Sequence, residues 1–128
     1  MVLVMLSFRD EENVSMPIPT PHEIAKISRP IARKHGVAKL YLFGSMALGT
    51  ANPRSDIDFI YDLPNDDSRC SKAIAFRHAL EEVFSHPIDL VRKIYIINPA
   101  KNEYKELLRS LFVNQLAQQP LYRILPTS

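Results

Sequence analysis

The chain has 128 residues, the length of one domain, and its shares of hydrophobic (46%) and charged (23%) residues are those of a soluble globular protein. The formal net charge of +2 is too small for extensive coating of nucleic acid, so direct nucleic-acid binding is not expected. A single cysteine, Cys70, excludes an internal disulfide and a cysteine-based zinc site, and it indicates a reducing, cytoplasmic compartment.

The N-terminal segment begins with an apolar run, residues 1–6, which is followed directly by charged residues 9–12. A spanning helix needs about 20 apolar residues, and a signal peptide needs a basic start, so neither is expected. Residues 1–19 are interpreted as an N-terminal extension, with disorder as one option and Met16 as a second candidate for the natural start. Residues 20–128 are expected to form one domain.

The first helix is predicted to begin at Thr20, because a capping threonine followed by Pro21 is a common helix start. Gly36 is expected to end it, and Pro30 predicts a kink or a division into two shorter helices. Its apolar residues recur at helical spacing: Ile24, Ile27 and Ile31.

Three strands are predicted, over residues 37–43, 56–61 and 88–97, from runs rich in β-branched and aromatic residues. A helical turn over residues 45–48 and a loop over residues 50–55 separate the first two. A helix ending near Ser85 should carry one apolar stripe, made by Ala73, Phe76, Leu80 and Val83. Pro99 opens a last helix whose stripe is interpreted as core: Tyr104, Leu107, Leu108, Leu111, Phe112 and Leu116.

The resulting order, α-β-β-α-β-α, predicts a small α/β fold. Tyr122, near the C-terminus, is left open between a packing role and an interface.

Two carboxylates, Asp56 and Asp58, stand two residues apart at the start of the second predicted strand. Residues two apart in a strand point to the same face, so both should project together while Ile57 points into the core. Two neighbouring carboxylates repel each other unless a hard cation lies between them. Magnesium takes oxygen ligands from a few carboxylates, water and substrate phosphates, so the pair predicts a magnesium site for a nucleoside triphosphate.

Gly44 and Ser45 follow the first predicted strand. Glycine permits a sharp turn without a Cβ that would block a phosphate, and free N–H groups at the start of the following helical turn favour an anion. Because a short connection joins the two strands, we expect this phosphate site to face the same cavity as Asp56 and Asp58.

A third carboxylate, Asp89, begins the third predicted strand. If that strand pairs with the second, Asp89 joins Asp56 and Asp58 as a candidate general base or second-metal ligand. The reaction indicated is in-line displacement of pyrophosphate by a hydroxyl group.

These residues form the pattern Gly44-Ser45, ten residues, Asp56-Ile57-Asp58, which resembles the DNA polymerase β-like nucleotidyltransferase superfamily. The match is closest to its minimal members, the MNT domains, called MntA-like when they act as antitoxins. The resemblance implies a small mixed β-sheet with helices packed on one face. It also implies that Asp56, Asp58 and Asp89 are catalytic and bind Mg²⁺, and that Gly44 and Ser45 bind the triphosphate of ATP.

The resemblance further implies a function in a toxin–antitoxin pair: transfer of AMP from ATP to a hydroxyl group of a HEPN-family toxin encoded nearby. The chain departs from many relatives because residues 46–48 contain no basic residue. The triphosphate charge would then be met by Arg54, or by Arg92 and Lys93.

Two other functions remain open: an antitoxin that neutralises its toxin by contact alone, and an aminoglycoside-type transferase acting on a small molecule. A small-molecule transferase usually needs a second domain, for which the chain has little room. The histidines (His22, His35, His78 and His86) show no metal-ligand spacing and are interpreted as surface or satisfied structural residues.

Overall fold

The computed structural model describes residues 18–64 and 66–127, so most of the predicted extension lies outside the described residues. Its centre is one mixed sheet with strand order β3-β2-β1-β4. β1 is antiparallel to β2 and β4, whereas β2 is parallel to β3. The strands are β1 (Lys39–Phe43), β2 (Ile57–Asp62), β3 (Ile88–Arg92) and β4 (Tyr122–Leu125).

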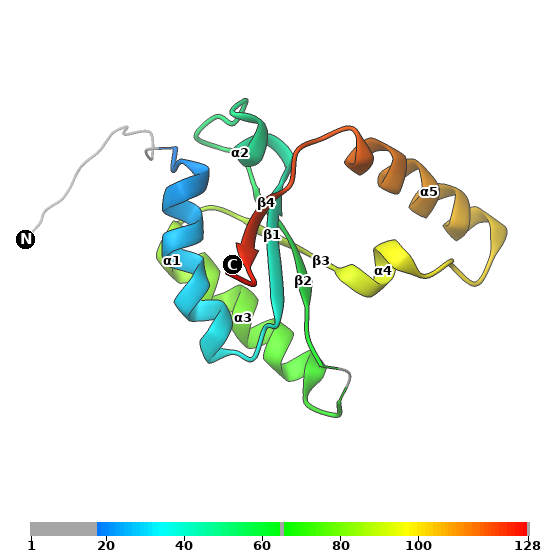
Figure 1. Ribbon diagram of the computed structural model, residues 1–128, viewed down its shortest axis with the longest axis horizontal. Coiled ribbons are helices and arrows are strands. Elements are labelled where there is room, and N and C mark those ends of the chain that lie inside the picture. The colour runs from blue at the N-terminus through cyan, green and yellow to red at the C-terminus, as the bar shows by residue number, and fades with distance from the viewer. Residues whose placement is uncertain (1–17, 65, 128) are drawn as a thin grey trace, which may run out of the picture.

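Five helices accompany this sheet in the described part of the chain, and none of them is long and apolar enough to cross a bilayer. Figure 1 shows α1 and α3 on one side of the sheet and α4 and α5 extending away on the other. The mixed sheet and the α/β fold class are confirmed. The helices are α1 (Pro21–Lys34), α2 (Gly44–Leu48), α3 (Arg69–Phe84), α4 (Lys93–Ile97) and α5 (Glu103–Ala117).

The predicted start of α1 is confirmed by a reciprocal capping box. The Glu23 amide donates to Thr20 Oγ1 (3.1 Å), and the Thr20 amide donates to Glu23 Oε1 (2.8 Å). α1 continues through Pro30, so the predicted division into two helices is wrong. Buried residues on both sides of Pro30, such as Ile24 and Ala32, hold the helix against the core, and this packing outweighs the missing N–H group.

The main core lies between the sheet and the helices α1 and α3. Alternate strand residues point into it, as the period of a strand requires. The predicted stripe of α3 holds at Phe76 and Leu80, whereas Val83 is exposed and Phe84 is buried instead. The fully buried strand residues of this core are Leu40, Leu42, Ile57, Phe59 and Ile124.

A second, smaller cluster covers the opposite face of the sheet, where Leu116 of α5 packs with Phe43 and Ile60. The predicted third strand is too long, because β3 ends at Arg92 and residues 93–97 form α4. Isoleucines favour a strand locally, but Ile96 packs against this second cluster in a helical segment, so tertiary packing overrides the local preference.

The last helix also departs from its prediction. α5 begins at Glu103 rather than near Pro99, and it is capped by the Asn102 side chain. The interpretation of its whole stripe as core is wrong: Phe112 and Leu116 pack on the sheet, but the outer half is exposed. The exposed stripe residues are Tyr104, Leu107, Leu108 and Leu111, with exposed fractions of 70%, 57%, 45% and 57%.

Two charged side chains tie α5 to the segment before it. Glu106 pairs with Arg109 (2.9 Å) and accepts a hydrogen bond from the Ala100 amide at 2.7 Å, while Arg109 donates to the carbonyl of Ile96. The Arg109 hydrogen bond lowers the pKa of Glu106 to about 2, so this carboxylate stays ionised at neutral pH. These contacts set the angle at which α5 leaves α4.

The strand β4 was not predicted. It pairs with β1, and the carbonyl of Ile124 accepts a hydrogen bond from the Arg29 side chain (3.1 Å), so the C-terminal residues complete the sheet. Tyr122, which the sequence left open, is a strand residue whose side chain is 36% exposed.

We expect Ile124→Ala to lower the free energy of unfolding by about 2–5 kcal/mol, the usual cost of truncating a fully buried isoleucine. Urea denaturation followed by circular dichroism measures this difference. Leu121→Ala, at a neighbouring exposed position, is the control and should cost less than about 1 kcal/mol. Equal effects of the two substitutions would contradict the role of β4 in the core.

Candidate active site

The register of the sheet brings two of the predicted carboxylates together. Asp58 of β2 lies directly beside Asp89 of β3 in the parallel pair, where neighbouring strands are about 4.8 Å apart. Asp56 precedes β2 by one residue and is exposed, as is Asp89. The expectation that β3 would pair with β2 and carry Asp89 to the other two carboxylates is met by this register.

The protonation of Asp58 reflects its surroundings. Burial raises the pKa of this carboxyl group most, and the negative charges of Asp89 and then Asp56 raise it further, from 3.8 to about 6. Asp58 is partly buried whereas Asp56 and Asp89 are exposed, so Asp58 is the innermost carboxylate of the three, and the charges of both others act on it. The site therefore concentrates negative charge around the half-buried carboxylate of Asp58.

The carboxylates around Asp58 offer one or two oxygen ligands to a hard cation. No ion pair or hydrogen bond within the described residues compensates Asp56, Asp58 or Asp89. In the described ranges, no group of three acidic, histidine or cysteine side chains is arranged to hold a metal ion. Mg²⁺ does not require one, since it commonly takes one or two carboxylates and fills its remaining positions with water and phosphate oxygens.

Gly44 is in direct contact with this carboxylate cluster. Its φ is +75°, and a Cβ at this position would lie 2.2 Å from Asp58 Oδ2, so no other residue fits without displacing the carboxylate. Ser45 is the next residue of α2, whose N-cap, Phe43, supplies no side-chain acceptor for the first N–H groups. The expected neighbourhood of Gly44, Ser45 and Asp58 is therefore present.

The basic residues considered for the triphosphate separate into two groups. Arg54 lies in the loop before Asp56, and its guanidinium makes no hydrogen bond or ion pair with the described part of the chain. Arg92 pairs in register with Tyr61, three residues along the strands from the Asp58–Asp89 pair, or about 10 Å away. Lys93 lies near Lys39 and Asp62, at the far end of β2. Arg92 and Lys93 therefore lie farther along the sheet from the Asp58–Asp89 pair, whereas Arg54 lies in the loop next to Asp56.

His86 was interpreted as a surface or satisfied residue, and the structure corrects this in part. The ring is 4% exposed and its Nδ1 lies 3.1 Å from the carbonyl oxygen of Ser55, but its buried Nε2 has no partner among the described residues. The next residue, Pro87, accepts a hydrogen bond from the Ile57 amide (2.9 Å). These two contacts hold the loop that carries Asp56 against the start of β3. The sequence signal was only the pair His86-Pro87 before a strand, which indicates no such contact.

A pocket of about 180 Å³ opens beside Gly44 and Asp58, and residues of α5 form its other wall. Sequence reasoning missed this part of the site, because about 50 residues or more separate the α5 positions from Asp58. This wall is lined by Phe112, Gln115 and Leu116 of α5 and by Gln119, which lies two residues after the helix ends.

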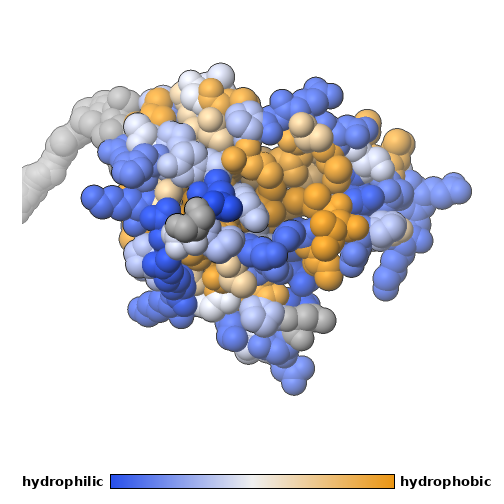
Figure 2. All heavy atoms as spheres, in the orientation of Figure 1, coloured by the Kyte–Doolittle hydropathy of each residue, from blue (hydrophilic) through white to orange (hydrophobic). Residues whose placement is uncertain are grey.

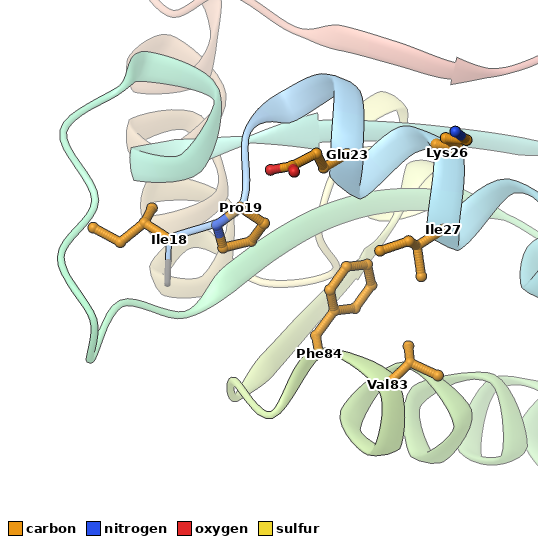
Figure 3. Close-up of a pocket in the computed structure, with 7 residues that line it drawn as sticks. All are labelled: Ile18, Pro19, Glu23, Lys26, Ile27, Val83 and Phe84. Atoms are coloured by element: carbon orange, nitrogen blue, oxygen red, sulfur yellow. The ribbon is translucent and has the colours of Figure 1, made fainter. Parts of the chain in front are cut away.

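A larger cavity lies elsewhere. About 730 Å³ in volume, it sits between the start of α1 and the end of α3, among side chains that Figure 3 shows as mostly apolar. Its two charged residues are Glu23 and Lys26, and the Glu23 carboxylate is engaged in the capping box. The cavity therefore lacks the paired carboxylates and phosphate-binding turn that mark the site at Asp58.

Comparison with known proteins identifies the family of the chain. The family model described as nucleotidyltransferase domain matches residues 24–113, which include every predicted site residue. No curated protein sequence matches the chain significantly.

One of the similar solved structures shows the same fold. A chain from the complex of tri-AMPylated Shewanella oneidensis HEPN toxin with MNT antitoxin aligns with 15% identity and a TM-score of 0.51, over 84% of this chain and 74% of its own. Chains from a mutant MntA-HpeT toxin–antitoxin (15% identity) and from a toxin–antitoxin with AMP-PNP (17%) each align with a TM-score of 0.46. Each of these alignments covers 73% of this chain and 86% of the other.

We expect Gly44→Ala to be more destabilising than Gly49→Ala. Both glycines have a positive φ (+75° and +78°), so each substitution costs about 1–2 kcal/mol of backbone strain. Only at Gly44 does the new methyl group also collide with Asp58, since nothing lies within 4 Å of a Cβ at Gly49. Urea denaturation gives the free energy of unfolding of both variants, and the difference between them measures the cost of the collision. Equal losses of free energy in the two variants would show that Gly44 and Asp58 are not in contact.

We expect Asp58→Asn to stabilise the metal-free protein at neutral pH. Because the folded pKa of Asp58 (about 6) exceeds the ordinary value of 3.8, its contribution to stability is fully present below about pH 4 and is lost as the pH rises through 6. The Tm difference between variant and wild type, measured in EDTA, should grow from pH 4 to pH 7.

Asp67→Asn, at an exposed position, serves as the control and should show no such pH dependence. Added Mg²⁺ should raise the Tm of the wild type and of Asp67→Asn but not that of Asp58→Asn. A Tm difference for Asp58→Asn that stays constant from pH 4 to pH 7 would refute the charge repulsion.

Proposed function

Because the chain belongs to the nucleotidyltransferase domain family, we propose that it transfers AMP from ATP to a hydroxyl group of a partner protein. The observation that carries this proposal is the contact of Gly44 with Asp58, which itself lies beside Asp89. A turn suited to phosphate and a cluster of uncompensated carboxylates thus meet at one point.

In the proposed reaction, the acceptor oxygen attacks the α-phosphorus of ATP. The new O–P bond forms as the bond between the α-phosphorus and the bridging oxygen to the β-phosphate breaks, and pyrophosphate leaves. Asp89 is exposed at the edge of the cluster and accepts the proton of the attacking hydroxyl. Asp56 and Asp58, with Asp89 as a further donor, would hold Mg²⁺, which supplies charge neutralisation for the phosphates when bound.

The triphosphate is proposed to lie over Gly44 and Ser45. The first N–H groups of α2 and the Ser45 hydroxyl supply donors there, and Gly44 keeps the approach open. The Arg54 guanidinium makes no hydrogen bond or ion pair with the described part of the chain. Because Arg54 belongs to the loop that leads to Asp56, we propose that it supplies positive charge to the triphosphate.

An exposed apolar surface supports a protein as the acceptor rather than a small molecule. Figure 2 shows apolar side chains gathered in the region of α4 and α5. Contiguous exposed apolar side chains are a common mark of protein–protein contact. The most exposed side chains of this α4–α5 surface are Ile97, Tyr104, Leu107 and Leu111.

The partner is proposed to be a HEPN-family toxin encoded nearby. The structural neighbour with the same fold comes from a complex in which an MNT antitoxin accompanies a tri-AMPylated HEPN toxin, and this motivates the choice. We also propose that residues 20–128 act as one domain and that the protein acts in the cytoplasm, where ATP is available and the exposed Cys70 stays reduced.

We expect the protein, mixed with labelled ATP, Mg²⁺ and the neighbouring toxin, to label the toxin. The double substitution Asp56→Asn with Asp58→Asn should lower this labelling by at least about 10³-fold, because both proposed metal ligands are lost. Asp66→Asn with Asp67→Asn, two exposed acids outside the site, is the matched control and should label normally. Full labelling by the Asp56/Asp58 variant would exclude chemistry at this site.

The exposed α4–α5 surface also favours a second candidate function, neutralisation of the toxin by contact alone. The same double variant separates the two in cells that express the toxin. Loss of protection with retained toxin binding in a pull-down favours AMP transfer. Full protection of the cells by the Asp56/Asp58 variant favours neutralisation by contact alone.

A further inference from the structure

The pocket beside Gly44 and Asp58 is too small for a whole nucleotide. At about 180 Å³ it is below the roughly 300–1,000 Å³ of pockets that hold drug-sized ligands, so it fits a single ring system. It lies between the carboxylate cluster and the inner end of α5. A group bound there is therefore adjacent to the proposed phosphate site.

The walls of the pocket suit a flat aromatic group. Phe43 and Phe112 meet edge to face with their ring centroids 6.0 Å apart, and buried Leu116 lies beside them. Apolar and aromatic side chains provide surfaces on which a nucleobase stacks, regardless of which base it is. Selection of one nucleobase over another must then come from polar groups in the pocket wall.

Gln119 lines the pocket, and one of its polar atoms lacks a partner. Its Oε1 is buried and accepts no hydrogen bond from the described residues, so the carboxamide must rotate to present this oxygen to a ligand. A buried acceptor without a donor is costly, so its environment favours a ligand that brings an N–H group. The 6-amino group of adenine is such a donor, and a glutamine carboxamide can bind adenine through N6 and N7 together. Guanine presents an oxygen at the corresponding position and would repel Oε1.

We propose that this pocket binds the adenine base of ATP and that Gln119 selects adenine over guanine. The inference rests on the proposed function, since it assigns the base of the same nucleotide whose phosphates lie at Gly44 and Ser45. Gln119 is thus a specificity-determining residue in the turn after α5, distant in sequence from the motif that binds the phosphates.

The acceptor side chain of the partner protein is a less favourable occupant. Its hydroxyl group must reach Asp89, the proposed base, and Asp89 is not among the described residues that line the pocket. A hydroxyl group bound at Gln119 would instead lie against Gly44 and Asp58, on the nucleotide side of the cluster.

Binding of Mg²⁺-ATP and Mg²⁺-GTP to the full chain, measured by calorimetry, tests the proposal without requiring an acceptor. The wild type should bind ATP about 10–100-fold more tightly than GTP, the discrimination expected of one bidentate pair of hydrogen bonds. Gln119→Leu keeps the approximate volume but removes the carboxamide, and it should bind both nucleotides with similar affinity. Gln118→Leu, an exposed neighbour outside the pocket, should retain the wild-type preference.

Equal binding of ATP and GTP by the wild type would overturn this inference and leave the proposed transfer reaction intact. An unchanged preference for ATP over GTP in Gln119→Leu would overturn it as well. If Gln119→Leu lowers labelling of the toxin while leaving nucleotide affinity unchanged, the pocket serves the acceptor and the proposal is wrong. Binding of neither nucleotide by the wild type would refute the proposed function itself.

Discussion

Every feature of the site depends on the two neighbours of β2. Its parallel pairing with β3 sets Asp58 beside Asp89, and its antiparallel pairing with β1 sets Asp58 opposite Phe43, so that Gly44 follows at the point of closest approach. A shift of β2 by one residue relative to these neighbours would turn Asp58 into the core and expose the apolar residues that alternate with it. The burial of Ile57 and Phe59 therefore also holds the carboxylate in place.

This arrangement works against the stability of the empty protein. Three carboxylates share a small region, one of them half-buried, and no basic side chain in the described ranges neutralises them. Such a cluster is unfavourable until a cation binds, so binding energy and folding energy are linked at Asp58. The same crowding explains Gly44, where even one methyl group would occupy the position of the carboxylate oxygen.

The local part of the fold was predictable from the sequence, and the long-range part was not. Capping at Thr20, the turn at Gly44 and the face shared by Asp56 and Asp58 follow from spacing and residue type, and the fold and family were confirmed. The extent of β3, the strand around Ile124 and the exposure of Leu107 depend on which residues meet across the sheet. Gln119 and His86 have no local signal, because their roles arise from contacts made only in the folded chain.

The helix α5 has two unlike halves. Its inner end contributes Leu116 to a buried cluster and Gln115 to the pocket, whereas Leu107 and Leu111 of its outer half are exposed to solvent. Substitutions of these two leucines therefore change the free energy of unfolding little, and they do not touch the carboxylates. During evolution, recognition of a new partner can diverge along this half of the helix while the chemistry of the inner end is preserved.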